Sequence, residues 1–373
     1  MIRTTHTGSL PRPDDLLPLL QQADEGRLAD RAAFEARVGR AVGEIVQKQR
    51  ALGIDIVNDG EQGKIDYSTY IKDRLRGFEG EGAAPPLGAD LKEFPEFAAR
   101  RPTAASTKRP TCSGPIAWKD WNAVEREIQT LKRASEASGS GEVFMTSVSP
   151  GQAARFLLNR YYPTHEAYVA ALADVLKREY AAIVDAGFVL QIDCPDLASG
   201  RNNQFQDLTL EQFRRVVAGH IEALNHAVAG LPPERMRLHV CWGNYEGPHH
   251  RDVPLRDIVD LLLTARPAGL SVEGANPRHA HEWEVFEHVK LPEGKVLIPG
   301  VIDNTTHFIE HPELVAQRLV QYARVVGRDR VIAGVDCGFA TFAGRPGLDS
   351  RIAWAKLGAM VEGARLATKK LGD

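Results

Sequence analysis

His239 and Cys241 lie one residue apart at the end of an apolar run that begins at Met236. In a β-strand, residues i and i+2 point to the same face, so both side chains can reach one ion. Glu273 and Cys337 end two later apolar runs. An imidazole, two thiolates and a carboxylate form a ligand set typical of zinc. The spacing therefore predicts a zinc site. The alternative interpretation is that the histidine and cysteine fill a core.

Polar side chains end six of the eight apolar runs that we interpret as strands. Besides the four candidate ligands, these endings include Asp59-Gly-Glu61, Asp193-Cys-Pro195 and Asp303-Asn-Thr305. Barrel enzymes carry their chemistry at the carboxyl ends of the strands. Glu61 and Asp193 are therefore candidates for substrate binding. Their alternative role is to cap neighbouring helices.

The elements that position these residues alternate along the chain. Helical stretches end near Gly53, Gly187 and Gly269, and a short run rich in Val and Ile follows each glycine. The eight predicted strands are 54–58, 108–113, 143–148, 188–193, 236–241, 269–273, 296–302 and 330–336. The clearest intervening helix is His165 to Ala186.

This order predicts an α/β fold, a single (β/α)8 TIM barrel. The alternative is a doubly wound open sheet, but the first strand is not followed by the glycine-rich loop of that fold. We expect one domain over residues 1–373. Residues 78–107, which carry four prolines, are interpreted as an insertion before the second strand, either a surface excursion or a lid.

Composition excludes several classes of protein. The net charge of -3 gives no electrostatic reason to expect a nucleic-acid partner or an anionic membrane. No run of about 18 apolar residues predicts a membrane span. We expect a cytoplasmic protein, which keeps its four cysteines reduced. The sequence is compatible with both a monomer and a homo-oligomer. Four further histidines are expected on solvated loop or helix faces: His249, His250, His279 and His281.

An ordered series of short motifs resembles the catalytic barrel of the cobalamin-independent methionine synthase family. The motifs are Thr4-Thr-His-Thr-Gly-Ser-Leu-Pro11, Asp59-Gly-Glu61, Ser113-Gly-Pro115, Gln191-Ile-Asp193, His239-x-Cys241, Glu273, Gly300-Val-Ile-Asp303 and Asp336-Cys-Gly338. The resemblance implies a barrel related to methionine synthase and uroporphyrinogen decarboxylase. It also implies that Zn²⁺ is held by His239, Cys241, Glu273 and Cys337.

The resemblance further implies a zinc-dependent thiol methyltransferase. The metal would convert a thiol such as homocysteine to its nucleophilic thiolate, which takes a methyl group from a small-molecule donor. The family's acceptor site falls on Ser9, Glu61 and Asp193. After the seventh strand the family has Asp-Ile-His, whereas this chain reads Asp303-Asn-Thr305. Asp303 and His307 are therefore candidates for the acid that delivers a proton, with His6 as another. We expect Glu273 to be the ligand that gives way to substrate, because oxygen is the hardest donor of the set.

Three other functions remain open. Epoxyalkane:coenzyme M transferases are similar stand-alone barrels, and a sulfonate-bearing thiol would need cations such as Lys64 and Arg201. A metal-free barrel of the uroporphyrinogen decarboxylase type would need arginines gathered at the mouth of the barrel, and Arg12 and Arg201 are too few. A non-catalytic zinc-binding protein would leave Glu61 and Asp193 without a role.

Overall fold

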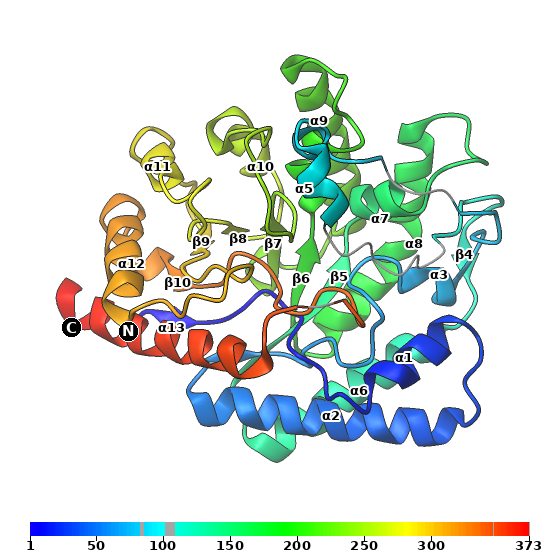
Figure 1. Cartoon of the computed structure of the whole chain (residues 1–373), viewed down its shortest axis with the longest axis horizontal. Coiled ribbons are helices and arrows are strands. Elements are labelled where there is room, and N and C mark those ends of the chain that lie inside the picture. Colours follow the sequence, from blue (N-terminus) through cyan, green and yellow to red (C-terminus); the bar gives the residue numbers. More distant parts are fainter. Residues whose placement is uncertain (83–85, 101–108, 346, 373) are drawn as a thin grey trace.

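The computed structural model describes residues 1–82, 86–100, 109–345 and 347–372 (Figure 1). Six parallel strands lie side by side in chain order. They are β2 (Ile56–Val57), β5 (Glu142–Val148), β6 (Val189–Asp193), β7 (Met236–Val240), β8 (Gly269–Val272) and β9 (Val296–Pro299). All of their residues except Glu142, Gly269 and Val296 are buried, as expected for strands covered on both faces.

Two short strands complete the barrel. β10 (Ile332–Ala333) follows β9 through parallel bridges such as Leu297 to Val331, and β1 (Arg3–Thr4) pairs in parallel with β10. Asp55, next to β2, accepts hydrogen bonds from the backbone N and the hydroxyl of Thr4 at 2.8 and 2.9 Å. The described residues thus form an eight-strand ring, which confirms the predicted (β/α)8 barrel.

One predicted strand is wrong. In the described part of 108–113, Thr111 and Cys112 pair only through isolated bridges, to Gly80 and Asn159. The eighth place in the ring belongs to β1, so the segment interpreted as an insertion lies between the second and third barrel strands. Its described residues, 78–82 and 86–100, carry α4 (Ala89–Lys92) and α5 (Pro95–Arg100). Outside the barrel, β3 (Leu75–Arg76) and β4 (Ala117–Trp118) form an antiparallel pair.

Helices surround the barrel (Figure 1). They are α1 (Leu17–Asp24), α2 (Arg31–Leu52), α3 (Ile71–Arg74), α6 (Trp121–Ser138), α7 (Pro150–Phe156), α8 (His165–Asp185), α9 (Leu210–Ala227), α10 (Val259–Leu262), α11 (Val285–His288), α12 (Pro312–Val326) and α13 (Ser350–Leu371). Short 3-10 turns lie at Pro195–Leu197, Ser199–Asn202, Pro233–Arg235, Leu255–Asp257, Glu282–Glu284 and Arg328–Arg330. No helix of the described residues is long and apolar enough to cross a membrane.

Local sequence signals set the ends of several helices. Asp30 and Thr164 accept hydrogen bonds from the first turns of α2 and α8. Gly53 ends α2 with φ of 92°, a left-handed conformation that favours glycine. The predicted helix over His165 to Ala186 is confirmed as α8. These caps direct the chain into the strands whose carboxyl ends carry the candidate site.

Candidate metal centre and cavity

Three of the four predicted zinc ligands converge. His239 lies in β7, Cys241 follows one residue after that strand, and Cys337 follows β10. Their ligand atoms lie within 4.8 Å of one another, and the two sulfur atoms are 3.8 Å apart. All three side chains are buried. Asn244 donates a hydrogen bond to the carbonyl of Gly338 at 2.7 Å, which ties together the two loops that carry the cysteines.

The donor atoms fit a zinc ion. The Nε2 atom of His239 is buried without a hydrogen-bond partner in the described structure, which leaves it free to bind a metal. Contacts with Cys337 and His239 lower the pKa of Cys241 well below that of an ordinary thiol. A thiolate is the form that binds metal, so one imidazole and two cysteines give a donor set suited to Zn²⁺.

Glu273 does not join these three residues. Its Oε1 atom accepts a hydrogen bond from the backbone N of Trp242 at 2.7 Å, and its Oε2 atom accepts one from Asn276 at 2.6 Å. Burial raises the pKa of Glu273 well above its usual range. The carboxylate therefore lies beside the loop that follows Cys241, and each of its oxygens accepts a hydrogen bond. Its role as a zinc ligand stays a prediction.

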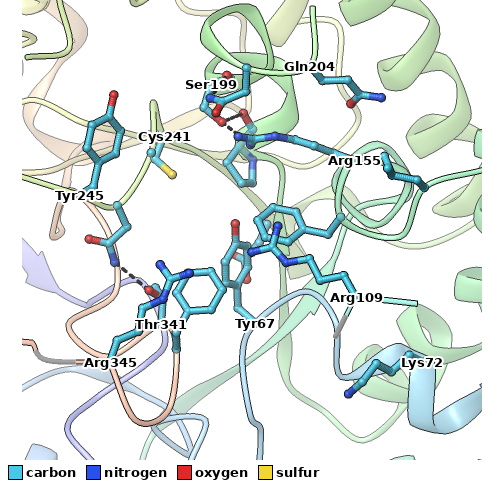
Figure 2. Close-up of a pocket in the computed structure, with 18 of the residues that line it drawn as sticks. Tyr67, Lys72, Arg109, Arg155, Ser199, Gln204, Cys241, Tyr245, Thr341 and Arg345 are labelled. Carbon is cyan, nitrogen blue, oxygen red and sulfur yellow. Dashed lines mark hydrogen bonds between the residues drawn. The ribbon is translucent and has the colours of Figure 1, made fainter. Parts of the chain in front are cut away.

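A cavity of about 1190 Å³ opens over the three metal-binding candidates. Its wall also contains Ser9, Glu61 and Asp193, the three residues that the resemblance assigns to the acceptor amino acid. Figure 2 shows this cavity with Cys241 facing it. The structure thus places the predicted metal site and the predicted acceptor site in one space.

Glu61 is held in an unusual state. Its φ is 54°, a left-handed backbone conformation that is costly for a residue other than glycine. Its Oε1 atom accepts a hydrogen bond from Thr146 at 2.9 Å, whereas Oε2 is buried without a partner. Burial raises the pKa of Glu61 to about 7. A side chain at Gly8 would place its Cβ 2.7 Å from Oε1, so this glycine makes room for the carboxylate.

Asp193 ends β6, and its Oδ1 atom accepts a hydrogen bond from Gln191 at 2.7 Å. Burial raises the pKa of Asp193 to about 6. Ser9 lies against the loop after Cys337, where its Oγ atom accepts a hydrogen bond from the backbone N of Ala340 at 3.4 Å. Two desolvated carboxyl groups in one cavity can bind an ammonium group strongly.

The candidate cations Lys64 and Arg201 do not line the cavity. The Nζ atom of Lys64 donates to the carbonyl of Thr146 at 2.8 Å and lies 4.3 Å from the centre of the Tyr70 ring. Lys64 is therefore connected to Glu61 through Thr146, and its positive charge opposes the rise in the pKa of Glu61. Arg201 donates to the carbonyls of Phe205 and Gln206 in its own loop.

The three candidate acids also lie outside the cavity wall. Asp303 accepts hydrogen bonds from Thr305 and Thr306; although burial opposes it, these bonds lower the pKa of Asp303. His307 is exposed. His6 bonds to Gln49 at 2.8 Å, and burial lowers its pKa to about 3. The geometry gives none of them contact with a substrate in this cavity.

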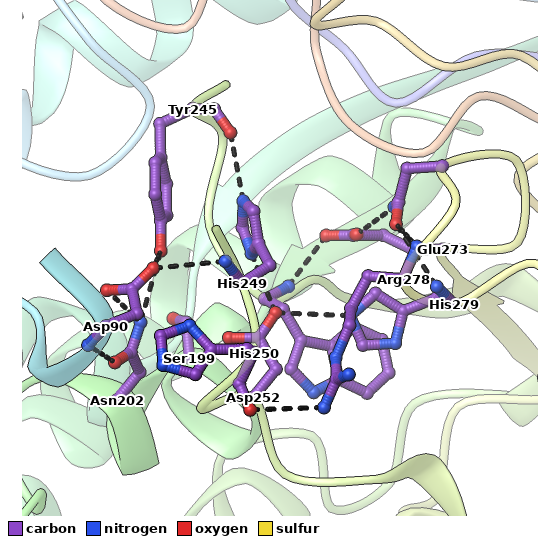
Figure 3. A network of polar contacts seen from close by, with 12 residues as sticks. Asp90, Ser199, Asn202, Tyr245, His249, His250, Asp252, Glu273, Arg278 and His279 are labelled. Atoms are coloured by element: carbon purple, nitrogen blue, oxygen red, sulfur yellow. Dashed lines mark hydrogen bonds and ion pairs between the residues drawn. The ribbon is translucent and has the colours of Figure 1, made fainter. Parts of the chain in front are cut away.

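Two histidines expected on solvated faces are instead part of a polar network (Figure 3). Asp252 accepts hydrogen bonds from His249 at 2.7 Å and from His279 at 3.2 Å. His279 is buried and stacks on Trp242 with ring centres 4.0 Å apart. The expectation for His249 and His279 is wrong, because Asp252 binds both rings and Glu282 also accepts a hydrogen bond from His279, at 2.8 Å. The network supports the loop that follows Cys241.

Sequence reasoning also missed part of the cavity wall. Tyr67, Arg109, Arg155 and Tyr245 all line it, and so does Arg345. The expectation that too few arginines gather at the mouth is therefore wrong. The one local signal was Ser149-Pro150, which caps α7 directly after β5 and places Arg155 at the rim. The other residues come from loops without a periodic pattern.

Comparison with known proteins identifies the family. A family model described as "Cobalamin-independent synthase, Catalytic domain" matches residues 159–366, more than half of the chain. The chain belongs to the cobalamin-independent methionine synthase family. The resemblance drawn from the motifs is thereby confirmed.

Relatives of this synthase family member match it over its whole length. The methionine synthase of Thermococcus kodakarensis is 26% identical over 372 residues, covering 100% of this chain and 95% of the relative. That of Saccharolobus solfataricus is 24% identical and is covered over 96% of its length. The structure of a B12-independent methionine synthase from a Shewanella species, in complex with selenomethionine, aligns with a TM-score of 0.77 at 22% identity. The alignment covers 100% of this chain and 99% of that one, which supports the barrel fold.

Proposed function

We propose that this synthase family member is a zinc-dependent methyltransferase that methylates a small thiol, with homocysteine as the expected acceptor. One observation carries the proposal: His239, Cys241 and Cys337 converge in the cavity that also contains Ser9, Glu61 and Asp193. The names of the full-length relatives, which are methionine synthases, support the same reaction.

In this proposal His239, Cys241 and Cys337 hold a zinc ion, which supplies a positive charge that favours the thiolate form of a bound thiol. Glu61 and Asp193 pair with the α-ammonium group of the acceptor and orient its side chain toward the cysteines. The buried walls exclude water from the thiol and strengthen these charge interactions. Glu273 is proposed as a fourth ligand, through an oxygen lone pair that its hydrogen bonds with Trp242 and Asn276 leave available.

The same carboxyl groups favour methyl transfer over the epoxide-opening alternative. Glu61 and Asp193 suit the α-ammonium group of homocysteine, which the sulfonate-bearing thiol lacks. The three converging ligand atoms also favour a metal-dependent reaction over a metal-free decarboxylase. The presence of carboxyl groups suited to a substrate favours an enzyme over a passive zinc-binding protein.

The test combines metal analysis with turnover. We expect one zinc per chain in the purified protein and methylation of homocysteine by a methyl donor. Cys241→Ser and Cys337→Ser should lose most of the metal and reduce turnover at least about a hundredfold, because each removes a thiolate ligand. Cys112→Ser is the matched control, since Cys112 is buried outside the cavity wall. Full zinc content and turnover in Cys241→Ser would contradict the proposal.

A further inference from the structure

Thr146 lies between a buried lysine and the carboxyl group of Glu61. The Nζ atom of Lys64 donates to the carbonyl of Thr146 at 2.8 Å and to its hydroxyl at 3.3 Å. The same hydroxyl donates to the Oε1 atom of Glu61 at 2.9 Å. Glu61 and Lys64 belong to the loop after β2, Thr146 belongs to the neighbouring strand β5, and all three residues are buried.

Lys64 fixes the direction of these hydrogen bonds. An ammonium group can only donate, so the Thr146 oxygen accepts from Lys64 and its single proton is left for Glu61. An ionised carboxylate accepts that proton, whereas a proton on Oε1 would make this atom a second donor in the same contact. The arrangement therefore favours the ionised form of Glu61 and engages Oε1. The Oε2 atom is buried and has no hydrogen-bond partner among the described residues.

The charge of Lys64 acts on Glu61 through space as well. The two acceptors of Lys64 on Thr146 are uncharged oxygens, and a buried ammonium group held in this way costs stability unless nearby carboxylates offset its charge. Burial is the main cause of the raised pKa of Glu61, and Lys64 opposes this rise more strongly than Arg12 does. Four charged groups face the carboxyl group of Glu61: Lys64, Asp193, Arg12 and Asp59.

We propose that Lys64 is a positioning residue of the acceptor site. Through the hydroxyl of Thr146 it holds the carboxyl group of Glu61 ionised and bound at Oε1, so that Oε2 remains for the ammonium group of the substrate. The inference rests on the proposed function for the identity of the group that Glu61 then binds. It also gives Lys64 a role that does not require it to line the cavity.

The direct test is ¹³C NMR of the purified, metal-analysed protein, labelled at the carboxyl carbon of its glutamate side chains and followed over pH. Glu61→Gln identifies the signal of Glu61 by its absence. We expect this signal to titrate with a pKa of about 7 in the wild-type protein. Lys64→Met should raise the midpoint by at least about one pH unit, because a nearby ammonium group favours the ionised form of a carboxyl group.

Two variants of Thr146 test the hydrogen bond separately from the charge. Thr146→Val removes the hydroxyl and should raise the midpoint of Glu61 by at least about half a pH unit, because the carboxylate loses a donor. Thr146→Ser keeps the hydroxyl and should leave the midpoint within about 0.2 pH units of the wild type. Equal midpoints in the valine and serine variants would contradict the role of the hydroxyl.

Lys295→Met is the matched control for the loss of a lysine. The Nζ atom of Lys295 also donates to backbone carbonyls, those of Ala265 and Pro267, but Lys295 precedes β9 at the opposite end of the barrel and lies outside the cavity wall. Its replacement should move the midpoint of Glu61 by less than about 0.2 pH units. An unchanged midpoint in Lys64→Met, or an equal shift in Lys295→Met, would overturn the proposal. If Lys64→Met does not fold, Lys64→Gln removes the same charge and takes its place.

A second measurement separates this inference from the proposed function. Methionine should bind to Lys64→Met at least about fivefold more weakly than to the wild type at pH 7, because a shift of one unit leaves about a tenth of Glu61 ionised instead of half. A shifted Glu61 signal in a protein that does not bind methionine would refute the proposed acceptor site and leave the effect of Lys64 on Glu61 standing. Methionine binding with an unshifted signal would overturn the role of Lys64 and leave the acceptor site standing.

Discussion

Glu61 is a residue whose environment opposes its ionisation. Its left-handed backbone, its unpartnered Oε2 atom and its raised pKa each cost stability. Arg12 holds the loop in place by donating to the carbonyls of Glu61 and Lys64 at 2.9 and 2.8 Å. A protein retains such energetic costs at a site where binding of a substrate offsets them. This agrees with a role of Glu61 in binding an ammonium group.

Glu61→Gln should therefore make the protein more stable at alkaline pH. The pKa of Glu61 is raised from 4.5 to about 7, so its contribution to stability is complete below pH 4.5 and is lost as the pH rises through 7. At pH 8 the variant should gain about 2 kcal/mol in the free energy of unfolding of the metal-free protein. Urea unfolding at pH 4.5 and 8 measures this. A gain that is equal at both pH values, or that also occurs in the exposed control Glu246→Gln, would contradict the assignment.

Binding of the acceptor should depend on the same ionisation. Methionine has the ammonium group of homocysteine without a free thiol, so the pH dependence of its affinity reports on Glu61 and Asp193 without the ionisation of a substrate thiol. Both carboxyl groups take up protons as the pH falls through about 7 and about 6, and methionine should then bind more weakly. We expect at least a tenfold loss between pH 8 and pH 5.5 by calorimetry. Affinity that is constant over this range would exclude the two carboxylates as the ammonium site.

The closure of the barrel depends on its shortest elements. β1 and β10 contribute two residues each to the ring, and Asp55 connects β1 to the edge of β2 through two hydrogen bonds from Thr4. Closure also positions the site, because the chain runs from β1 directly to Thr7 and Ser9 in the cavity wall.

Asp55→Ala should consequently loosen the first strand. Removal of the carboxylate leaves the backbone N and hydroxyl of Thr4 without their acceptor, at a cost of about 1–3 kcal/mol. Hydrogen exchange at Thr4 and Thr5 should accelerate, and the urea midpoint should fall. Asp14→Ala, at an exposed position in the following loop, should change neither measurement. Unchanged exchange at Thr4 in Asp55→Ala would show that the barrel closes without this contact.

At the scale of the whole molecule, the metal centre joins segments that are far apart in the chain. Cys241 and Cys337 are separated by 96 residues, yet their sulfur atoms are 3.8 Å apart. The proposed zinc ion would therefore link β7 to the end of β10 and stabilise the folded state by mass action.

Removal of the metal by a chelator should lower the midpoint of thermal unfolding by at least about 5 °C, and added zinc should restore it. Cys337→Ser should melt at a temperature that neither treatment changes. Differential scanning calorimetry of both proteins makes the comparison. A wild-type midpoint that is independent of chelator and zinc would show that no structural coupling exists between metal binding and the fold.

The sequence by itself determined the features that arise from local periodicity. The i, i+2 spacing placed His239 and Cys241 on one face, and the polar endings of apolar runs predicted which residues lie at the rim. The helix over His165–Asp185 and the glycine after α2 followed from helical spacing and capping. These features depend on interactions within a few residues, which the order of side chains already specifies.

Only the tertiary structure decided the contacts between segments. It assigned the ring position of β1, the burial of His279, the hydrogen bonds that Glu273 accepts and the arginines of the cavity wall. A two-residue strand has too few residues to show a period, and loop residues such as Arg109 have none. Their places depend on which distant side chains the closed barrel brings beside them, so the three-dimensional packing had to supply them.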